Sequence, residues 1–139
     1  MSSTNIKNIA IVGVSGNSGS HMATALLKTG RFNLTAITRA DSKSKPPKGI
    51  KAANVNYDDE SSLVTALKGH EALVTTLGIS AAPGTQEKLI RAAGEAGVSW
   101  IMPNEWTPDI SSEDVRNDVA AFADVYRVKE YIKEVGKSS

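Results

Sequence analysis

The chain has 139 residues, 22% of them charged, and a formal net charge of +1 at pH 7. This length corresponds to one domain, and the near-neutral charge excludes broad electrostatic capture of nucleic acid or of a membrane surface. The absence of cysteine excludes disulfides, thiol catalysis and thiolate metal sites.

Short apolar runs alternate with segments of helical spacing along the chain. The predicted strands are apolar or β-branched and cover residues 6–12, 32–37, 50–57, 72–77 and 98–102. The predicted helices have apolar residues three and four apart and cover 21–28, 59–67, 86–96 and the segment from Ser112 onward. Strands that alternate with helices form a parallel sheet with right-handed crossovers. We therefore predict an α/β fold, a doubly wound parallel sheet of about five strands in the order 3-2-1-4-5.

Three glycines follow the first predicted strand with the spacing Gly13-x-x-Gly16-x-x-Gly19. Between a strand and a helix, the first glycine permits a tight turn, the second lets the backbone approach a pyrophosphate, and the third lets the helix pack closely. The helix start then presents free N–H groups and its positive dipole end to phosphates. The pattern predicts a dinucleotide site made by Gly13, Ser15, Gly16, Asn17, Ser18 and Gly19. The alternative is a glycine-rich turn without a ligand.

The end of the second strand indicates which dinucleotide is bound, because an acidic residue there binds the ribose of NAD. This chain has Thr38 and Arg39 at that point, and Lys43 follows in a loop with further serine and lysine residues. Arginine stacks on aromatic rings and pairs with phosphate. We therefore predict NADP(H) as the cofactor, with Arg39 and Lys43 as contacts. Asp41 keeps NAD open, and a solvated basic loop is the alternative.

Five segments, in this order and spacing, resemble the NmrA-like and isoflavone-reductase-like proteins, which are atypical short-chain dehydrogenase/reductases. They are VGVSGNSG, the pair Thr38-Arg39, SLVTALKGHEALVTTLG, QEKLIRAAGEAGVSWIMPNEW and YRVKEYI. The fungal members are the most similar, and the resemblance covers nearly the whole chain. It implies a Rossmann domain that binds NADP(H), followed by a smaller substrate domain. We accordingly interpret 1–139 as an NAD(P)-binding Rossmann domain that is incomplete at its C-terminal end and lacks the substrate domain.

The resemblance also implies roles for single residues. Lys129 matches the lysine that assists proton transfer in enzymatic members; the alternative is one of several solvated lysines on an amphipathic helix. Asn56 stands where the family often has an aspartate near adenine, and Gly78 is expected to let the backbone approach the cofactor. In the segment PNEWT, which follows the fifth strand, we interpret Trp106 as a core or domain-interface aromatic. His21 is a candidate phosphate contact.

Three functions agree with these residues. The first is an NADPH-dependent reductase of a small carbonyl or enone-type substrate, with Lys129 assisting proton transfer. The second is a non-catalytic NADP(H)-sensing regulator, and the third is an inactive truncated form. Lys129 favours the first, although we expect this chain alone to turn over slowly, since it has no lid that excludes water and orients a substrate.

The remaining expectations concern partners and location. The only expected partner besides a small-molecule substrate is a second copy, because a sheet without its sixth strand leaves an apolar edge that favours a homodimer or aggregation. Neither histidine has metal-ligand spacing, so no metal is expected. The N-terminal MSSTNIKN is unlike a signal peptide, and no apolar run approaches the ~18 residues of a membrane span, so we expect a cytoplasmic protein that contacts neither membrane nor nucleic acid.

Overall fold

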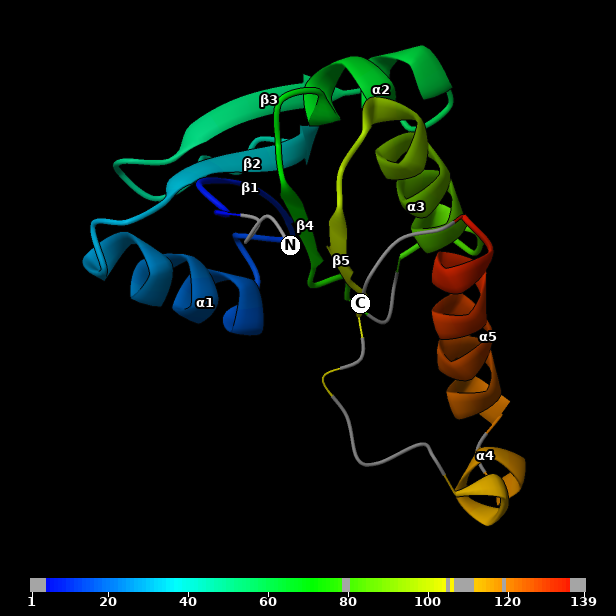
Figure 1. Ribbon diagram of the computed structural model, residues 1–139. Helices are drawn as coiled ribbons and strands as arrows, with labels where there is room; N and C mark the ends of the chain where they lie inside the picture. Colours follow the sequence, from blue (N-terminus) through cyan, green and yellow to red (C-terminus); the bar gives the residue numbers. More distant parts are fainter. Residues whose placement is uncertain (1–4, 79–80, 105, 107–111, 119, 136–139) are drawn as a thin grey trace.

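The computed structural model describes residues 5–78, 81–104, 106, 112–118 and 120–135 (Figure 1). Its strands are β1 (Asn8–Val12), β2 (Asn33–Arg39), β3 (Lys51–Val55), β4 (Ala72–Thr75) and β5 (Trp100–Met102). Its helices are α1 (Asn17–Lys28), α2 (Glu60–Leu67), α3 (Thr85–Ala96), α4 (Glu113–Asp118) and α5 (Ala120–Glu134). All strand pairs are parallel, in the order β3-β2-β1-β4-β5. The predicted doubly wound Rossmann-type sheet and its strand order are confirmed.

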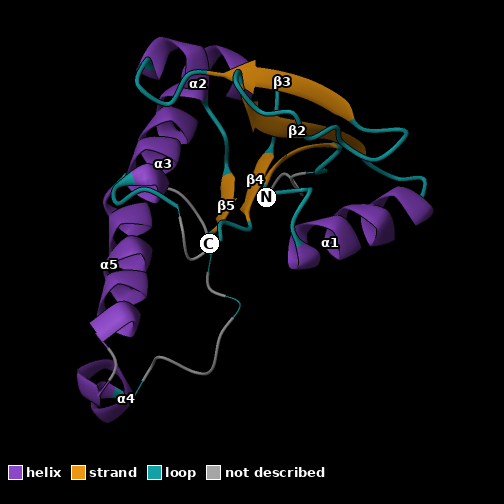
Figure 2. Ribbon diagram, turned by 180° about the vertical axis from the view of Figure 1, so that it is seen from behind, coloured by secondary structure: helices purple, strands orange, loops and turns teal. Residues whose placement is uncertain are grey.

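Helices cover both faces of the sheet, and the alternation of side chains along β1 shows why. Ile9 and Ile11 belong to the buried cluster on the face of α1, whereas Ala10 and Val12 belong to the cluster on the face of α2, α3 and α5. Successive residues of a strand point to opposite faces, so a strand buried on both sides is apolar throughout. Figures 1 and 2 show α1 by itself on one side of the sheet and the other helices on the opposite side.

The sheet has its topological switch point between β1 and β4. The chain leaves β1 through α1 toward β2 on one side, and it returns from β3 through α2 to β4 on the other side. Val12 lies opposite Ile37 of β2 and opposite Thr75 of β4, so the carboxyl ends of these three strands are neighbours. Connections that leave in opposite directions open a crevice at these ends, where ligands bind in such folds.

At the amino ends of the strands, the sheet is stabilised by Glu71, which directly precedes β4. Its carboxylate accepts hydrogen bonds from the backbone N–H groups of Asn8, at 2.6 Å, and Lys7, at 3.2 Å. The bond from Asn8 is the main reason that the pKa of Glu71 is lowered. A carboxylate thereby pairs the start of β1 with the start of β4.

Several element boundaries differ from the predicted ones. Helix α1 begins at Asn17, one turn before the predicted start, because its first turn consists of polar residues and Gly19 and so has no apolar periodicity. Strand β5 begins at Trp100 rather than at 98, since the N–H of Val98 still bonds to the carbonyl of Ala93 in the C-cap of α3. The C-terminal helical segment consists of α4 and α5. In α5 it is Val128 and Ile132 that are buried.

Candidate functional site

The turn between β1 and α1 is built around Thr76, which follows β4. The Thr76 hydroxyl donates to the carbonyl oxygens of Val12, at 2.7 Å, and Gly13, at 3.2 Å. A Cβ on Gly13, which has φ +87°, would lie 2.7 Å from the Thr76 hydroxyl oxygen and closer still to its carbonyl oxygen. A Cβ on Gly19 would collide with the carbonyl oxygen of Gly13 and the Thr76 hydroxyl. Two of the three glycines are therefore required by the packing of the protein itself.

Gly16 differs from the other two glycines. Its backbone is extended, with φ −79° and ψ 168°, a conformation that any residue can adopt. The nearest atom to an added Cβ would be the carbonyl oxygen of Gly13, at 3.3 Å. Gly16 also lines a cleft, so the space beside its Cα is open toward solvent. This open space is what a group that approaches the backbone closely requires.

The start of α1 is suited to an anion. Among the described residues, no side chain caps this end, and its first turn holds no acidic residue. By contrast, α2 is capped by Asp59, whose carboxylate accepts from the N–H of Ser61 at 3.1 Å, and its first turn contains Glu60. The first N–H groups of a helix have no partner within the helix and carry its positive dipole end. A carboxylate of the chain therefore already binds the N-terminal N–H groups of α2, whereas the start of α1 has none among the described residues.

Two clefts meet at the switch point. The large cleft, of about 620 Å³, is lined by the turn after β1, the end of β2, the 42–46 loop and Tyr57. The small cleft, of about 460 Å³, is lined by Gly16 to Gly19 of α1 and by Thr76, Asn104 and Trp106. Both clefts include Leu77 and Gly78 in their walls. Together they form one groove, called the switch-point groove below, that passes the glycine turn.

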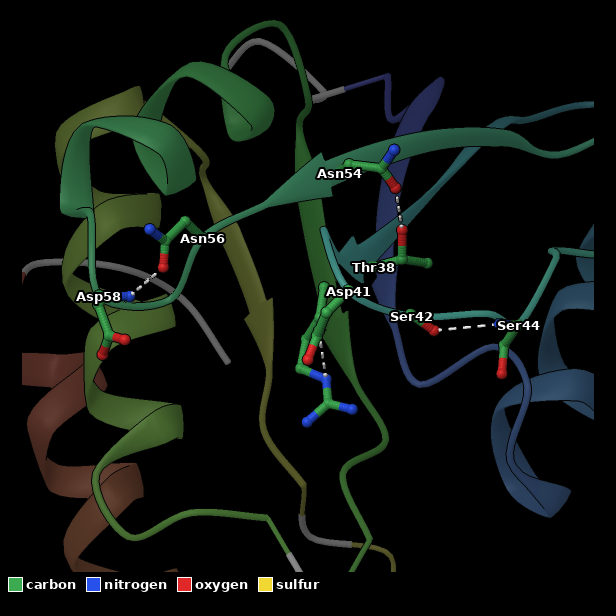
Figure 3. Close-up of polar contacts among 8 residues, drawn as sticks. Thr38, Asp41, Ser42, Ser44, Asn54, Asn56 and Asp58 are labelled. Atoms are coloured by element: carbon green, nitrogen blue, oxygen red, sulfur yellow. Dashed lines mark hydrogen bonds and ion pairs between the residues drawn. The ribbon is translucent and has the colours of Figure 1, made fainter.

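Polar side chains gather at the end of β2, where Arg39 and Ser42 line the large cleft; Figure 3 shows Thr38, Asp41 and Ser42 there. Arg39 Nε lies 3.4 Å from Asp41 Oδ1. The Thr38 hydroxyl donates to Asn54 Oδ1 at 2.8 Å, which fixes Thr38 to β3. Lys45 adds a second cation to the cleft wall. The rim therefore offers positive charge, partly compensated by one carboxylate.

Tyr57 closes the inner side of the large cleft and also packs against the buried cluster under α2 and α3. Burial raises the pKa of its phenol, and Arg39 lowers that pKa by a smaller amount. The phenol is therefore neutral near pH 7 and presents a flat, largely apolar wall.

A third cleft, of about 220 Å³, adjoins the switch-point groove on the side of α3 and α5. It includes Leu77, Gly78 and Asn104, which also line the groove, and adds Arg127 and Val128 of α5. Asn104 shapes the boundary, since its Nδ2 donates to the carbonyl of Leu77 at 2.9 Å and its backbone N–H donates to Gln86 Oε1 at 3.0 Å.

The structure brings most of the predicted cofactor residues together. Those that line the switch-point groove are Gly13, Ser15, Gly16, Asn17, Ser18, Gly19, Arg39 and Gly78. As the described residues define the groove, its walls do not include Lys43, Asn56 or His21. The Asn56 side chain instead accepts from the N–H of Asp58 at 3.0 Å and shapes the turn before α2 (Figure 3). Lys129 is partly buried on α5 and directly follows Val128 of the third cleft.

Trp106 contradicts one sequence interpretation. Its side chain is 42% exposed and belongs to neither buried cluster of the described residues, so the core half of the interpretation is wrong, whereas the domain-interface half stays a prediction. The indole N–H donates to the carbonyl of Thr75 at 2.9 Å, which places the ring in the wall of the small cleft, across from the start of α1. Its position after the fifth strand was the available signal, because carboxyl ends of parallel strands meet at one edge. Tyr57 and Asn104 were missed as wall residues in the same way.

Two absences hold for the described residues. None of their helices combines the length and apolar character needed to cross a membrane. Nor do three or more of their histidine, aspartate or glutamate side chains gather where they could hold a metal ion.

Known proteins resemble this chain in sequence and in fold. Oxidoreductase aprR of Aspergillus flavus is 35% identical over 129 residues, which is 91% of this chain and 41% of the relative. A structure of AtPrR2 with NADP+ and (+)pinoresinol superposes with a TM-score of 0.82 at 22% identity, over 95% of this chain and 47% of that one. A crystal structure of isoflavone reductase gives a TM-score of 0.71 at 26% identity, over 90% and 46%.

The chain thus spans less than half the length of these relatives. The sequence model of the NmrA-like family matches residues 5–139. The chain belongs to the NmrA-like family.

Proposed function

We propose that this chain binds NADP(H) and forms the cofactor-binding part of an NADPH-dependent oxidoreductase. The observation that carries the proposal is the switch-point groove, which passes the open Gly16 and the uncapped start of α1. Doubly wound sheets bind dinucleotides at this point. The NADP+ present in the AtPrR2 structure and the oxidoreductase description of the Aspergillus relative support the same cofactor and reaction class.

The groove has a suitable group for each part of the dinucleotide. Arg39 and Lys45 offer positive charge to a 2′-phosphate at the rim of the large cleft. The backbone beside Gly16 and the first N–H groups of α1 suit the diphosphate. The small cleft, between Gly78 and Trp106, remains for the nicotinamide end.

The proposed reaction is reduction of a small carbonyl or enone-type molecule. Bound NADPH supplies the hydride. We assign to Lys129 the transfer of the accompanying proton, because α5 lines the third cleft, which shares Asn104 with the small cleft.

A non-catalytic NADP(H)-sensing regulator is the second candidate. The observation in its favour is that, among the described residues, the walls of the three clefts do not include Lys129. Loss of NADPH oxidation in Lys129→Met with unchanged NADPH binding would support the enzyme. Binding without turnover of any small carbonyl or enone in a test panel would agree equally with the regulator and with an inactive form, because this chain alone is expected to turn over slowly.

Calorimetric titration with NADPH and with NADH tests the proposal. We expect micromolar binding of NADPH and weaker binding of NADH. Arg39→Ala should weaken NADPH binding about tenfold, since the ion pair with the 2′-phosphate is lost. The matched control is Arg91→Ala, which removes an arginine that pairs with Glu60 at 2.7 Å, away from the groove. Binding of neither nucleotide by the unchanged chain would refute the proposal.

A further inference from the structure

Arg39 is already paired in the chain without nucleotide. Its Nε lies 3.4 Å from Asp41 Oδ1, and the two side chains are 69% and 77% exposed (Figure 3). The backbone fixes this arrangement, because the N–H of Ser42 donates to the carbonyl of Arg39 at 2.9 Å and closes a turn. Asp41 therefore occupies the third position of a hydrogen-bonded turn whose first residue is Arg39.

The two partners differ in their relation to the large cleft. The wall of this cleft includes Arg39, Ser42 and Ser44. As the described residues define the wall, it does not include Asp41. A hydrogen bond from the N–H of Ser44 to the Ser42 hydroxyl, at 3.2 Å, continues the turned path of the loop beyond Asp41. The Asp41 carboxylate therefore lies outside the cleft wall and affects the cleft only by pairing with the guanidinium of Arg39.

We propose that Asp41 is the counter-ion that a 2′-phosphate displaces from Arg39, and that it thereby limits the preference of the site for NADPH over NADH. The inference rests on the proposed binding of NADP(H). A 2′-phosphate must separate Arg39 from Asp41 and must also approach a carboxylate of its own sign. NADH carries a hydroxyl at that position, so it meets neither cost. The carboxylate consequently weakens the binding of NADPH selectively.

The expected size of the effect follows from the exposure of the pair. An exposed ion pair changes an equilibrium constant by up to about fivefold, and salt weakens it. Asp41→Asn keeps the size of the side chain and its ability to form the turn, but it removes the charge. We expect this variant to bind NADPH about three- to fivefold more tightly at low salt, with unchanged affinity for NADH. The ratio of the two affinities should therefore rise by the same factor.

Asp58→Asn is the matched control. Asp58 is 92% exposed, lies in the turn before α2 and pairs with Lys88 at 3.6 Å, outside the walls of the large cleft as the described residues define them. The substitution Asp58→Asn removes the same charge from the molecule as Asp41→Asn does. Any change in nucleotide affinity that comes from net charge alone will therefore appear in both variants. We expect this control to leave the NADPH to NADH ratio unchanged. A rise in the ratio that equals that of Asp41→Asn would refute the local role of Asp41.

Calorimetric titrations of both variants at low and at high salt decide the question. The inference is supported if only Asp41→Asn raises the ratio and if added salt removes the gain. It is overturned if Asp41→Asn leaves the ratio unchanged while Arg39→Ala still lowers NADPH affinity, a result that leaves the proposed function intact. It is also overturned if NADH affinity falls in Asp41→Asn, since the carboxylate then binds the ribose hydroxyl directly. A chain that binds neither nucleotide refutes both proposals.

Discussion

Gly16→Ala and Gly19→Ala each add one methyl group to the same turn, yet we expect opposite effects on folding and on binding. At Gly19 the methyl group would meet the Gly13 carbonyl and would lie 2.5 Å from the Thr76 hydroxyl oxygen. At Gly16 it would meet only the Gly13 carbonyl, at 3.3 Å, and would project toward the small cleft. Gly19→Ala should therefore damage the fold, and Gly16→Ala should damage the nucleotide site.

The magnitudes follow from these distances. Inserting a methyl group into tightly packed backbone costs about 1–3 kcal/mol, and alanine recovers about 1 kcal/mol through its helix propensity. Gly19→Ala should thus lower the free energy of unfolding by about 2 kcal/mol, the upper end of this difference, because the methyl group would overlap a backbone carbonyl as well as the Thr76 hydroxyl. Gly16→Ala replaces an N-cap glycine whose dihedral angles alanine can adopt, so its cost should stay below about 1 kcal/mol. Its NADPH affinity should fall at least tenfold, because the methyl group stands where the diphosphate approaches the backbone.

Urea unfolding and NADPH titration measure the two effects separately. Gly94→Ala is the control for the substitution itself, since an added Cβ there would lie 3.7 Å from the Val135 side chain, an ordinary contact far from the turn. A Gly16→Ala variant that binds NADPH as tightly as the unchanged chain would show that no ligand approaches Gly16. A Gly19→Ala variant of full stability would show that the turn relaxes, and it would refute the packing argument.

Three further predictions concern other parts of the molecule. Nicotinamide in the small cleft should quench the fluorescence of Trp106. Trp100→Phe should therefore keep the quenching by NADPH, and Trp106→Phe should lose it. The opposite pattern would exclude the small cleft as the nicotinamide site. Glu71→Gln should cost about 1 kcal/mol of unfolding free energy at pH 7, because a charged acceptor of backbone N–H groups is lost. The hydrogen bond from Asn8 lowers the pKa of Glu71, so this stabilisation is complete above the ordinary pKa of 4.5 and vanishes as the pH falls through the lowered pKa. In urea unfolding from pH 7 to pH 3, the unfolding free energies of the unchanged chain and of Glu71→Gln should therefore converge. A difference that stays constant with pH would contradict the assignment. Finally, Trp100 and Met102 are 40% and 45% exposed on the edge strand β5, so sedimentation should show a dimer that Met102→Lys dissociates, whereas a monodisperse monomer would refute edge pairing.

The sequence was sufficient for the fold because its signals are local. The alternation of apolar runs with helical spacing predicts the strand order, and the structure confirms it. Boundaries failed where a polar turn carries no periodicity, as at Asn17, or where a helix cap continues into an apolar segment, as at Val98. Both failures have the same cause: the state of those residues is decided by backbone hydrogen bonds, which side-chain patterns do not record.

The candidate site was predictable only in part, because its walls come from segments distant in sequence. The glycine spacing predicted the turn, but not that Thr76 makes two of the glycines necessary. Trp106 was interpreted as a core or domain-interface aromatic, because an aromatic residue after a strand has the same local signal whether it is buried or lines a cleft. The role of Lys129 remains a prediction, and so does the part of Asn56 in binding adenine.

The hydroxyl of Thr76 joins segments that are 63 and 64 positions apart in the chain. The turn after β1 is therefore held in two ways, locally by the bond from the Gly16 N–H to the Gly13 carbonyl at 3.0 Å and across the sheet by Thr76 after β4. Contacts of such high sequence separation slow folding, since the entropy of closing a long loop must be overcome before they form. A nucleotide that binds this turn would also stabilise the pairing of β1 with β4, because it binds only the folded state. At a hundred times its Kd it would add about 2.7 kcal/mol to the free energy of unfolding.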